Sequence, residues 1–319
     1  MVGTMRRMLL AVVISLAVGA CSTPQTDFLR LHPNAVPTRG AVLEPVFFTQ
    51  RTKECGPAAL AMVLTHSGIR VDPNDLVDDV YNPGREGSLT SAVLAAARRH
   101  ARIAYPIDNL IDLLREVSHR RPVLVLQNLS LQWLPQWHYA VAVGYDLKQG
   151  TITLHSGKTE FLKMPLETFE HTWSRGGHWA LLTLRPGEFP QRADEKVYVK
   201  AVAGVERAGH ATTAAEAYKA AVGRWPNSLV ALMGLGNALY KLGKHRAAAN
   251  AFRNASVRHP DSAAAFNNLA HVLAELGKLD EGEQAARTAI ALGGPNIGNY
   301  RETLLSIMTK RSRNDAGDR

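Results

Sequence analysis

The residues of this sequence best suited to chemistry are one cysteine and one histidine, each at the start of an apolar run. Cys55 is followed by Gly56, Pro57 and an alanine- and leucine-rich helical pattern. A thiol at a helix N-terminus lies at the positive end of the helix dipole, which favours the thiolate. His138 opens a run typical of a strand and could take the thiol proton. This combination points to nucleophilic catalysis.

The first 20 residues have the parts of a secretory signal. Arg6 and Arg7 precede an apolar stretch that is too short to span a bilayer permanently. The stretch ends in Val18-Gly19-Ala20-Cys21, which resembles the lipobox of bacterial lipoproteins. The resemblance implies that residues 1–20 are cleaved and that Cys21 is acylated. Ser22 after the cysteine implies sorting to the outer membrane, facing the periplasm. The alternative is an ordinary cleaved signal with a chance cysteine.

The number of cysteines bears on the role of the second one. The chain has two. If Cys21 carries lipid, Cys55 has no partner for a disulfide, and an unpaired thiol in an exported protein suggests a reactive group. A free cysteine can also be a small buried hydrophobe, so the count alone does not decide.

Composition describes an ordinary globular protein with room for two domains. The 319 residues are 46% hydrophobic and 20% charged, and the net charge is +9. The basic excess is evenly spread and would suit anionic lipid, nucleic acid or acidic peptides equally. Since basic and aromatic residues do not interleave, we expect no nucleic-acid binding. Metal-ligand spacings and phosphate loops are not found, so we expect neither metal nor cofactor.

The middle of the chain predicts an α+β domain over residues 43–188, preceded by a Pro- and Thr-rich tether over 21–42. Helical patterns come first and short β-rich runs follow, with a hairpin turn at 148–150 that indicates an antiparallel sheet. The predicted helices cover 56–67, 91–99 and 108–118, and the predicted strands cover 122–127, 137–145, 151–154 and 179–184.

The last third of the chain, from residue 194 to 310, shows an internal repeat. Several independent columns of small residues recur every 34 positions, among them Gly209, Gly243 and Gly277, and Ala217, Ala251 and Ala285. The segment resembles tetratricopeptide repeats, three units long, with a capping helix over 297–310. The resemblance implies an all-α superhelix with a concave surface for a peptide or protein partner. The alternative is a purely structural spacer.

A second resemblance covers residues 46–184. Gln50, which four residues separate from Cys55-Gly56-Pro57, and the later run from His138 to Asp146 are similar to the bacteriocin-processing, double-glycine leader peptidase family of papain-like cysteine peptidases. The resemblance implies that Cys55 is the nucleophile, His138 the general base, and Gln50 the side-chain donor to the oxyanion. It also implies a papain-like fold. Because this chain is predicted to be exported, we do not transfer the double-glycine substrate to it.

The third member of the site departs from that family pattern. Family members have Asp-Pro where this chain has His155-Ser156. Either side chain could orient the imidazole by a hydrogen bond, but neither can stabilise its positive charge, so Ser156 is a weak candidate for the third member. A backbone carbonyl or Asn128 are further possibilities. Asp146 lies eight residues along the same strand from His138, about 26 Å at ~3.3 Å per residue, and cannot reach it. Five other histidines compete for the base role: His66, His100 and His119, with His155 and His178 as reserve candidates.

Together these patterns predict a lipid-anchored periplasmic cysteine peptidase whose repeats recruit a substrate or partner. A cell-wall endopeptidase of the wider papain-like group is a second enzyme hypothesis, although its Asp-Cys-Ser-Gly signature is absent. A non-catalytic peptide-binding adaptor is the alternative from another class.

Overall fold

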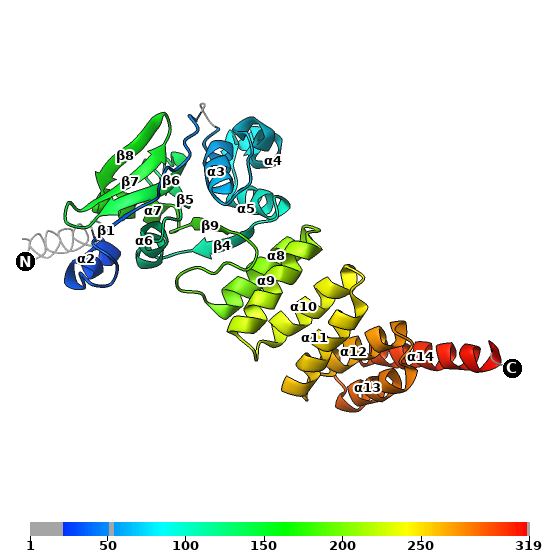
Figure 1. Ribbon diagram of the computed structural model, residues 1–319. Coiled ribbons are helices and arrows are strands. Elements are labelled where there is room, and N and C mark those ends of the chain that lie inside the picture. Colours follow the sequence, from blue (N-terminus) through cyan, green and yellow to red (C-terminus); the bar gives the residue numbers. More distant parts are fainter. Residues whose placement is uncertain (1–21, 51–53, 318–319) are drawn as a thin grey trace, which may run out of the picture. The chain divides into compact units, whose positions relative to one another are not determined.

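The computed structural model describes residues 22–50 and 54–317 (Figure 1). The predicted signal and the predicted lipidation site, Cys21, lie outside these residues. Contacts divide the chain into two compact units, one of Met1–His66, Arg70–Leu89 and Pro106–Leu182, the other of Ser67–Ile69, Thr90–Tyr105 and Thr183–Arg319. Within the described ranges, none of the helices is both long enough and apolar enough to cross a membrane.

The N-terminal part combines helices with an antiparallel sheet. The helices are α2 (Pro24–Leu31), α3 (Cys55–His66), α4 (Val77–Val80), α5 (Thr90–Arg99), α6 (Leu110–Ser118) and α7 (Leu166–Arg175). The strands are β1 (Arg39–Ala41), β2 (Tyr81–Asn82), β3 (Gly87–Ser88), β4 (Ile103–Ile107), β5 (Val123–Asn128), β6 (Trp137–Asp146), β7 (Thr151–Ser156), β8 (Thr159–Pro165) and β9 (Ala180–Leu184). The predicted α+β class is confirmed.

Strand β6 is the centre of the main sheet. The sheet has seven strands in the order β4-β9-β5-β6-β7-β8, and β1 pairs with the far end of β6. The β5–β6 register places Gln127 opposite His138, and the β6–β7 register places Val141 opposite His155. Each predicted strand corresponds to an observed one, β5, β6, β7 and β9 in turn, whereas β4 and β8 were not predicted.

Helix α3 is buried along most of its length. Nine consecutive residues, from Gly56 to Leu64, are buried. A helix that is apolar on all sides has no face to turn to water, so it belongs in a core. It packs against β6 and β5. Its first residue, Cys55, is therefore held against the strand that carries His138.

Residues 24–42 are folded onto the sheet domain, which differs from the predicted tether. The buried carboxylate of Glu170, 2% exposed, accepts hydrogen bonds from Gln25 N (2.9 Å), Thr26 N (2.7 Å) and Thr26 Oγ1 (2.6 Å). These bonds satisfy N–H groups of the first turn of α2, which have no partner within the helix. Strand β1 pairs with β6, and Val36 and Val42 are buried. Composition predicted a tether because the apolar residues in this stretch are few.

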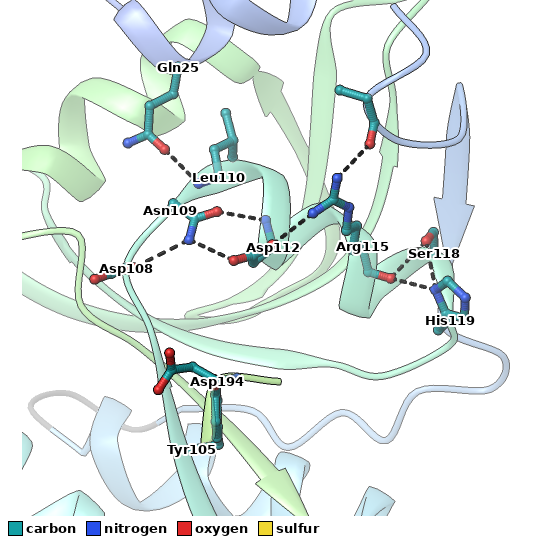
Figure 2. A network of polar contacts seen from close by, with 11 residues as sticks. Gln25, Tyr105, Asp108, Asn109, Leu110, Asp112, Arg115, Ser118, His119 and Asp194 are labelled. Atoms are coloured by element: carbon teal, nitrogen blue, oxygen red, sulfur yellow. Dashed lines mark hydrogen bonds and ion pairs between the residues drawn. The ribbon is translucent and has the colours of Figure 1, made fainter. Parts of the chain in front are cut away.

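Helix α6 provides the second attachment of this segment (Figure 2). The Gln25 side-chain oxygen accepts from Leu110 N at 2.6 Å, and Arg115 Nη2 donates to Ala35 O at 3.1 Å. Asn109 caps α6 by accepting from Asp112 N at 2.9 Å. The first residues after the predicted lipidation site are thus tied to two helices of the domain.

The C-terminal part is a series of helices, as the 34-residue period predicted. They are α8 (Glu195–Arg207), α9 (Ala211–Arg224), α10 (Leu229–Lys241), α11 (His245–Arg258), α12 (Ala263–Glu275), α13 (Leu279–Leu292) and α14 (Ile297–Gly317). Gly209, Gly243 and Gly277 all have positive φ, between 68° and 93°. Glycine tolerates that conformation just after a helix, which explains why this column is glycine.

Other repeat columns have equally direct physical roles. Asp194, Ser228 and Ser262, also 34 apart, each cap the following helix by accepting a backbone N–H with the side chain. A Cβ at Gly236 would lie 2.4 Å from the Phe252 ring. The small residue lets α10 and α11 approach closely, as the repeat pattern predicted.

Candidate active site

Cys55 begins α3 with its side chain partly buried. Burial raises the pKa of the Cys55 thiol, and backbone N–H groups of Tyr139, Cys55 and Gly56 oppose this by stabilising the thiolate. Burial outweighs the three N–H groups, so the resting thiol is protonated at neutral pH. This burial opposes the thiolate that the position at the helix start predicts.

His138 is the second residue of β6 and is joined to the end of β7. Its Nε2 lies 2.8 Å from Ser156 Oγ. Burial lowers the pKa of His138, so its ring is neutral at pH 7. When Nε2–H donates to Ser156, Nδ1 is left with its lone pair, which is the tautomer that a base needs. The structure thus brings Ser156, a weak candidate in the sequence, to the imidazole.

Tyr139, the next residue of β6, lies beside Cys55. The Tyr139 N–H reaches the thiol, and the Tyr139 phenol donates to Ser88 O at 3.1 Å. Burial and the neighbouring Cys55 both raise the pKa of that phenol. Two adjacent residues of β6 therefore have different roles: His138 carries the imidazole, and Tyr139 contacts the thiol. Sequence reasoning assigned no role to Tyr139 or Ser88, and only the position of Tyr139 next to His138 could have indicated one.

Gln50 connects β6 to the turn after Ser156. Gln50 is only 4% exposed. Its Nε2 donates to Tyr139 O at 3.1 Å, and its Oε1 accepts from Gly157 N at 3.0 Å. Its own N–H donates to Gly157 O, also at 3.0 Å. The side chain thus fixes the turn next to Ser156. Since an amide nitrogen carries two hydrogens, the predicted donation to an oxyanion is compatible with these bonds.

Gly56 has no room for a side chain. A Cβ there would lie 2.2 Å from Ser88 Oγ and 2.5 Å from Ser88 Cβ. That serine hydroxyl is buried and has no hydrogen-bond partner within the described part of the chain. The close approach of β3 to the first turn of α3 explains why glycine follows Cys55.

The other candidates for the third member lie elsewhere. Asn128 Oδ1 accepts from Ser130 N (3.1 Å) and Gln136 N (2.9 Å), so its side chain closes the loop between β5 and β6. Asp146 pairs with Arg39 at 2.7 Å. It lies at the far end of β6 from His138, as its spacing along the strand predicted. Neither side chain orients the His138 ring.

The reserve histidines are part of the packing. His155 is fully buried, and its Nδ1 donates to Val46 O at 3.2 Å. The ring packs edge-on against Phe47 and Phe161, and its buried Nε2 has no partner within residues 22–50 and 54–317. His178 packs edge-on against Trp173. His66 ends α3, and His119 bonds to its own helix through Arg115 O.

The buried imidazole of His155 predicts a loss of stability in acid. Burial lowers its pKa from the ordinary value of 6.5, so the unfolded chain takes up a proton more readily than the folded one. This contribution to stability is present above pH 6.5 and is lost as the pH falls. We expect His155→Asn, which retains a donor for Val46 O, to weaken the fall of the unfolding midpoint between about pH 7 and pH 5. An unchanged pH dependence in thermal unfolding would contradict this assignment.

Comparisons with known proteins agree with this organisation. The model of the Peptidase_C39 like family matches residues 42–180, and a tetratricopeptide-repeat model matches residues 205–245 and 233–297. A search of the curated proteins finds no match to this chain.

Similar solved structures exist for each part. A protein described as a C39-like peptidase from Bacillus anthracis is 18% identical, with a TM-score of 0.39, over 47% of this chain and 98% of its own. The translocator chaperone SycD of Yersinia enterocolitica is 16% identical, with a TM-score of 0.36, over 38% of this chain and 90% of its own. The first TPR of Spaghetti, bound to an HSP90 peptide, is 18% identical, with a TM-score of 0.35, over 37% of this chain and 93% of its own. The two family models identify residues 42–180 as a Peptidase_C39-like domain that tetratricopeptide repeats follow.

Proposed function

We propose that the chain is a cysteine peptidase with Cys55 as nucleophile and His138 as base. The observation that carries the proposal is the arrangement on β6, where the Tyr139 N–H bonds to the thiol and the neighbouring imidazole is bonded to Ser156. The match to a peptidase-like family supports it. Since burial keeps both thiol and imidazole neutral, the proton moves between them during the reaction rather than before it.

The reaction follows from these two groups. His138 Nδ1 takes the thiol proton as Cys55 Sγ attacks the carbonyl carbon of the scissile peptide bond. The resulting oxyanion takes hydrogen bonds from the Cys55 N–H and the Gln50 amide. The imidazolium then protonates the departing amine, and a thioester remains on Cys55. Water, activated by the same imidazole, hydrolyses the thioester and restores the thiol.

The direct test is cleavage of a diverse peptide library by the purified full chain, read by mass spectrometry. We expect wild type to cleave peptides of the library. No cleavage should remain after thiol alkylation or in a Cys55→Ala sample prepared in the same way. If neither sample cuts any peptide, the peptidase assignment fails. Native peptides trapped by Cys55→Ala would identify the substrate.

Ser156 is proposed as a positioning residue, and its substitution has a distinctive outcome. Ser156→Ala removes one hydrogen bond to the imidazole, so kcat/KM should fall roughly tenfold. Ser156→Asp supplies a carboxylate that stabilises the imidazolium and raises the pKa of His138. We therefore expect the acid limb of the kcat/KM profile of Ser156→Asp to move to higher pH. If neither variant changes the pH profile or the rate, Ser156 does not act through His138.

A non-catalytic adaptor is the second candidate, favoured by one observation. The bond to the His138 ring comes from a serine hydroxyl, which orients an imidazole but does not stabilise its positive charge as a carboxylate does. If the library stays intact and Cys55→Ala binds peptides as tightly as wild type, this function replaces the peptidase.

Export, lipid anchoring and partner recruitment complete the proposal. The sequence before Ser22 supports an outer-membrane lipoprotein that faces the periplasm, and the repeats supply stacked helices of the kind that bind proteins. Globomycin treatment or Cys21→Ser should release the chain from membranes. Unchanged membrane fractionation would contradict the anchor.

A further inference from the structure

The loop between β5 and β6 exposes an unusual number of large apolar side chains. We define the apolar hairpin as residues 129–137, which carry no charged side chain in a chain of net charge +9. Trp133 is 81% exposed, and Leu134 is 69% exposed. Leu129, Leu131 and Trp137 are exposed by 41–54%. Soluble proteins rarely gather such side chains in the solvent without a binding role.

The backbone of the apolar hairpin is held in place. Leu129 N donates to Gln136 O at 2.9 Å, and Leu134 N donates to Leu131 O at 3.1 Å. The buried Asn128 side chain accepts from both arms of the hairpin, as described above, and Arg175 Nε donates to Asn128 O at 3.2 Å. A loop that is fixed in this way presents its apolar side chains at little further cost in conformational entropy on binding.

The apolar hairpin is continuous with the candidate active site. Its last residue, Trp137, directly precedes His138 on β6. Trp133 is five residues from the base, so the chain allows at most roughly 18 Å between their Cα atoms. A peptide whose scissile bond lies at Cys55 and His138 therefore meets the hairpin within about five residues of that bond.

We propose that the apolar hairpin binds large apolar side chains of the peptide substrate, close to the scissile bond. The inference rests on the proposed peptidase function and assigns its substrate class. An uncharged surface excludes charged side chains through the cost of desolvating them, and it gains from burying Leu, Phe or Met. A membrane surface is the less suitable occupant, because interfacial segments commonly add Lys or Arg and this hairpin has none.

The test compares wild type with the double variant Trp133→Ala and Leu134→Ala, both in the full chain. A peptide from the library that wild type cleaves is resynthesised with Leu, Ser or Lys at each position flanking the cut. We expect wild type to prefer Leu at one or more positions. The double variant should lose roughly tenfold or more in kcat/KM on the Leu peptide and change little on the Ser peptide. Leu305→Ala, an exposed leucine of α14, is the matched control and should behave as wild type.

Several outcomes separate this inference from the peptidase proposal. Equal loss on the Leu and Ser peptides, or no loss, would overturn the inference while cleavage itself stands. If wild type cleaves nothing, binding of Leu-rich and Ser-rich library peptides to the full chain is measured. Binding of the Leu-rich set that depends on the hairpin supports the inference without the peptidase, and equal binding of the two sets overturns it.

Co-sedimentation with phosphatidylethanolamine and phosphatidylglycerol vesicles tests the membrane alternative. If co-sedimentation is lost in the double variant while cleavage is retained, the hairpin is assigned to membranes instead.

Discussion

Cys55→Ala and His138→Ala should each lower kcat/KM for peptide cleavage by roughly 10⁴-fold or more. Cys55 supplies the nucleophile that attacks the peptide bond, and the neutral imidazole of His138 supplies the base that its protonated thiol requires. The measurement is the rate of cleavage of a library-derived peptide. Unfolding midpoints close to that of wild type show that the variants are folded.

The double variant distinguishes a catalytic pair from two independent residues. Groups that act as a unit lose their effect together, so Cys55→Ala with His138→Ala should be no slower than either single variant. His119→Ala is the matched control, since that exposed ring bonds only to its own helix and to the adjacent Ser118 in the described contacts, and it should retain full activity. Residual activity in Cys55→Ala close to that of wild type would exclude this nucleophile.

Glu170→Ala should destabilise the domain by about 3 kcal/mol or more. The substitution removes the acceptor of three hydrogen bonds to Gln25 and Thr26. Each bond to a charged acceptor contributes roughly 1.5–3 kcal/mol, and donors left buried without a partner add a desolvation penalty. The free energy of unfolding in urea gives the total loss. Hydrogen exchange should accelerate first in residues 24–42, which this carboxylate ties to the domain.

Two further substitutions make the Glu170 prediction specific. Thr26→Val removes the hydroxyl donor alone and should cost roughly 1.5 kcal/mol, the lower end of the range for one bond to a charged acceptor. Glu170→Gln retains an accepting oxygen and should fall between Thr26→Val and Glu170→Ala. A loss under about 1 kcal/mol in Glu170→Ala, with unchanged exchange in residues 24–42, would show that these bonds do not hold the segment.

The parts of the fold that depend on local pattern could be predicted from the sequence. The apolar spacing over residues 56–67 predicts a helix, which the structure has as α3. The repeat period predicts the C-terminal helices because its glycine column has positive φ just after a helix and its alanine columns are buried. The edge strand β8 was missed because its residues alternate poorly, and most of them are exposed.

The parts that depend on distant partners could not be predicted. Glu170 lies about 145 positions from the helix that it anchors, and nothing in its local sequence distinguishes it from a surface carboxylate. Ser156 reaches His138 because β7 pairs with β6, with Val141 opposite His155, and a strand pattern does not reveal which strands pair. The pKa of Cys55 depends on its burial against β6, which outweighs the favourable position at a helix start.

The dependence of Cys55 alkylation on pH tests the partnership of thiol and imidazole most directly. Iodoacetamide labelling of the peptide that carries Cys55 is followed by mass spectrometry in wild type and in His138→Ala. With His138 as base, the wild-type rate should rise with a midpoint below the ordinary histidine pKa of 6.5 and then stay level. The variant should react only as its thiol ionises, above the ordinary cysteine value of 9.0. Coincident profiles that rise only above pH 9.0 would contradict the account.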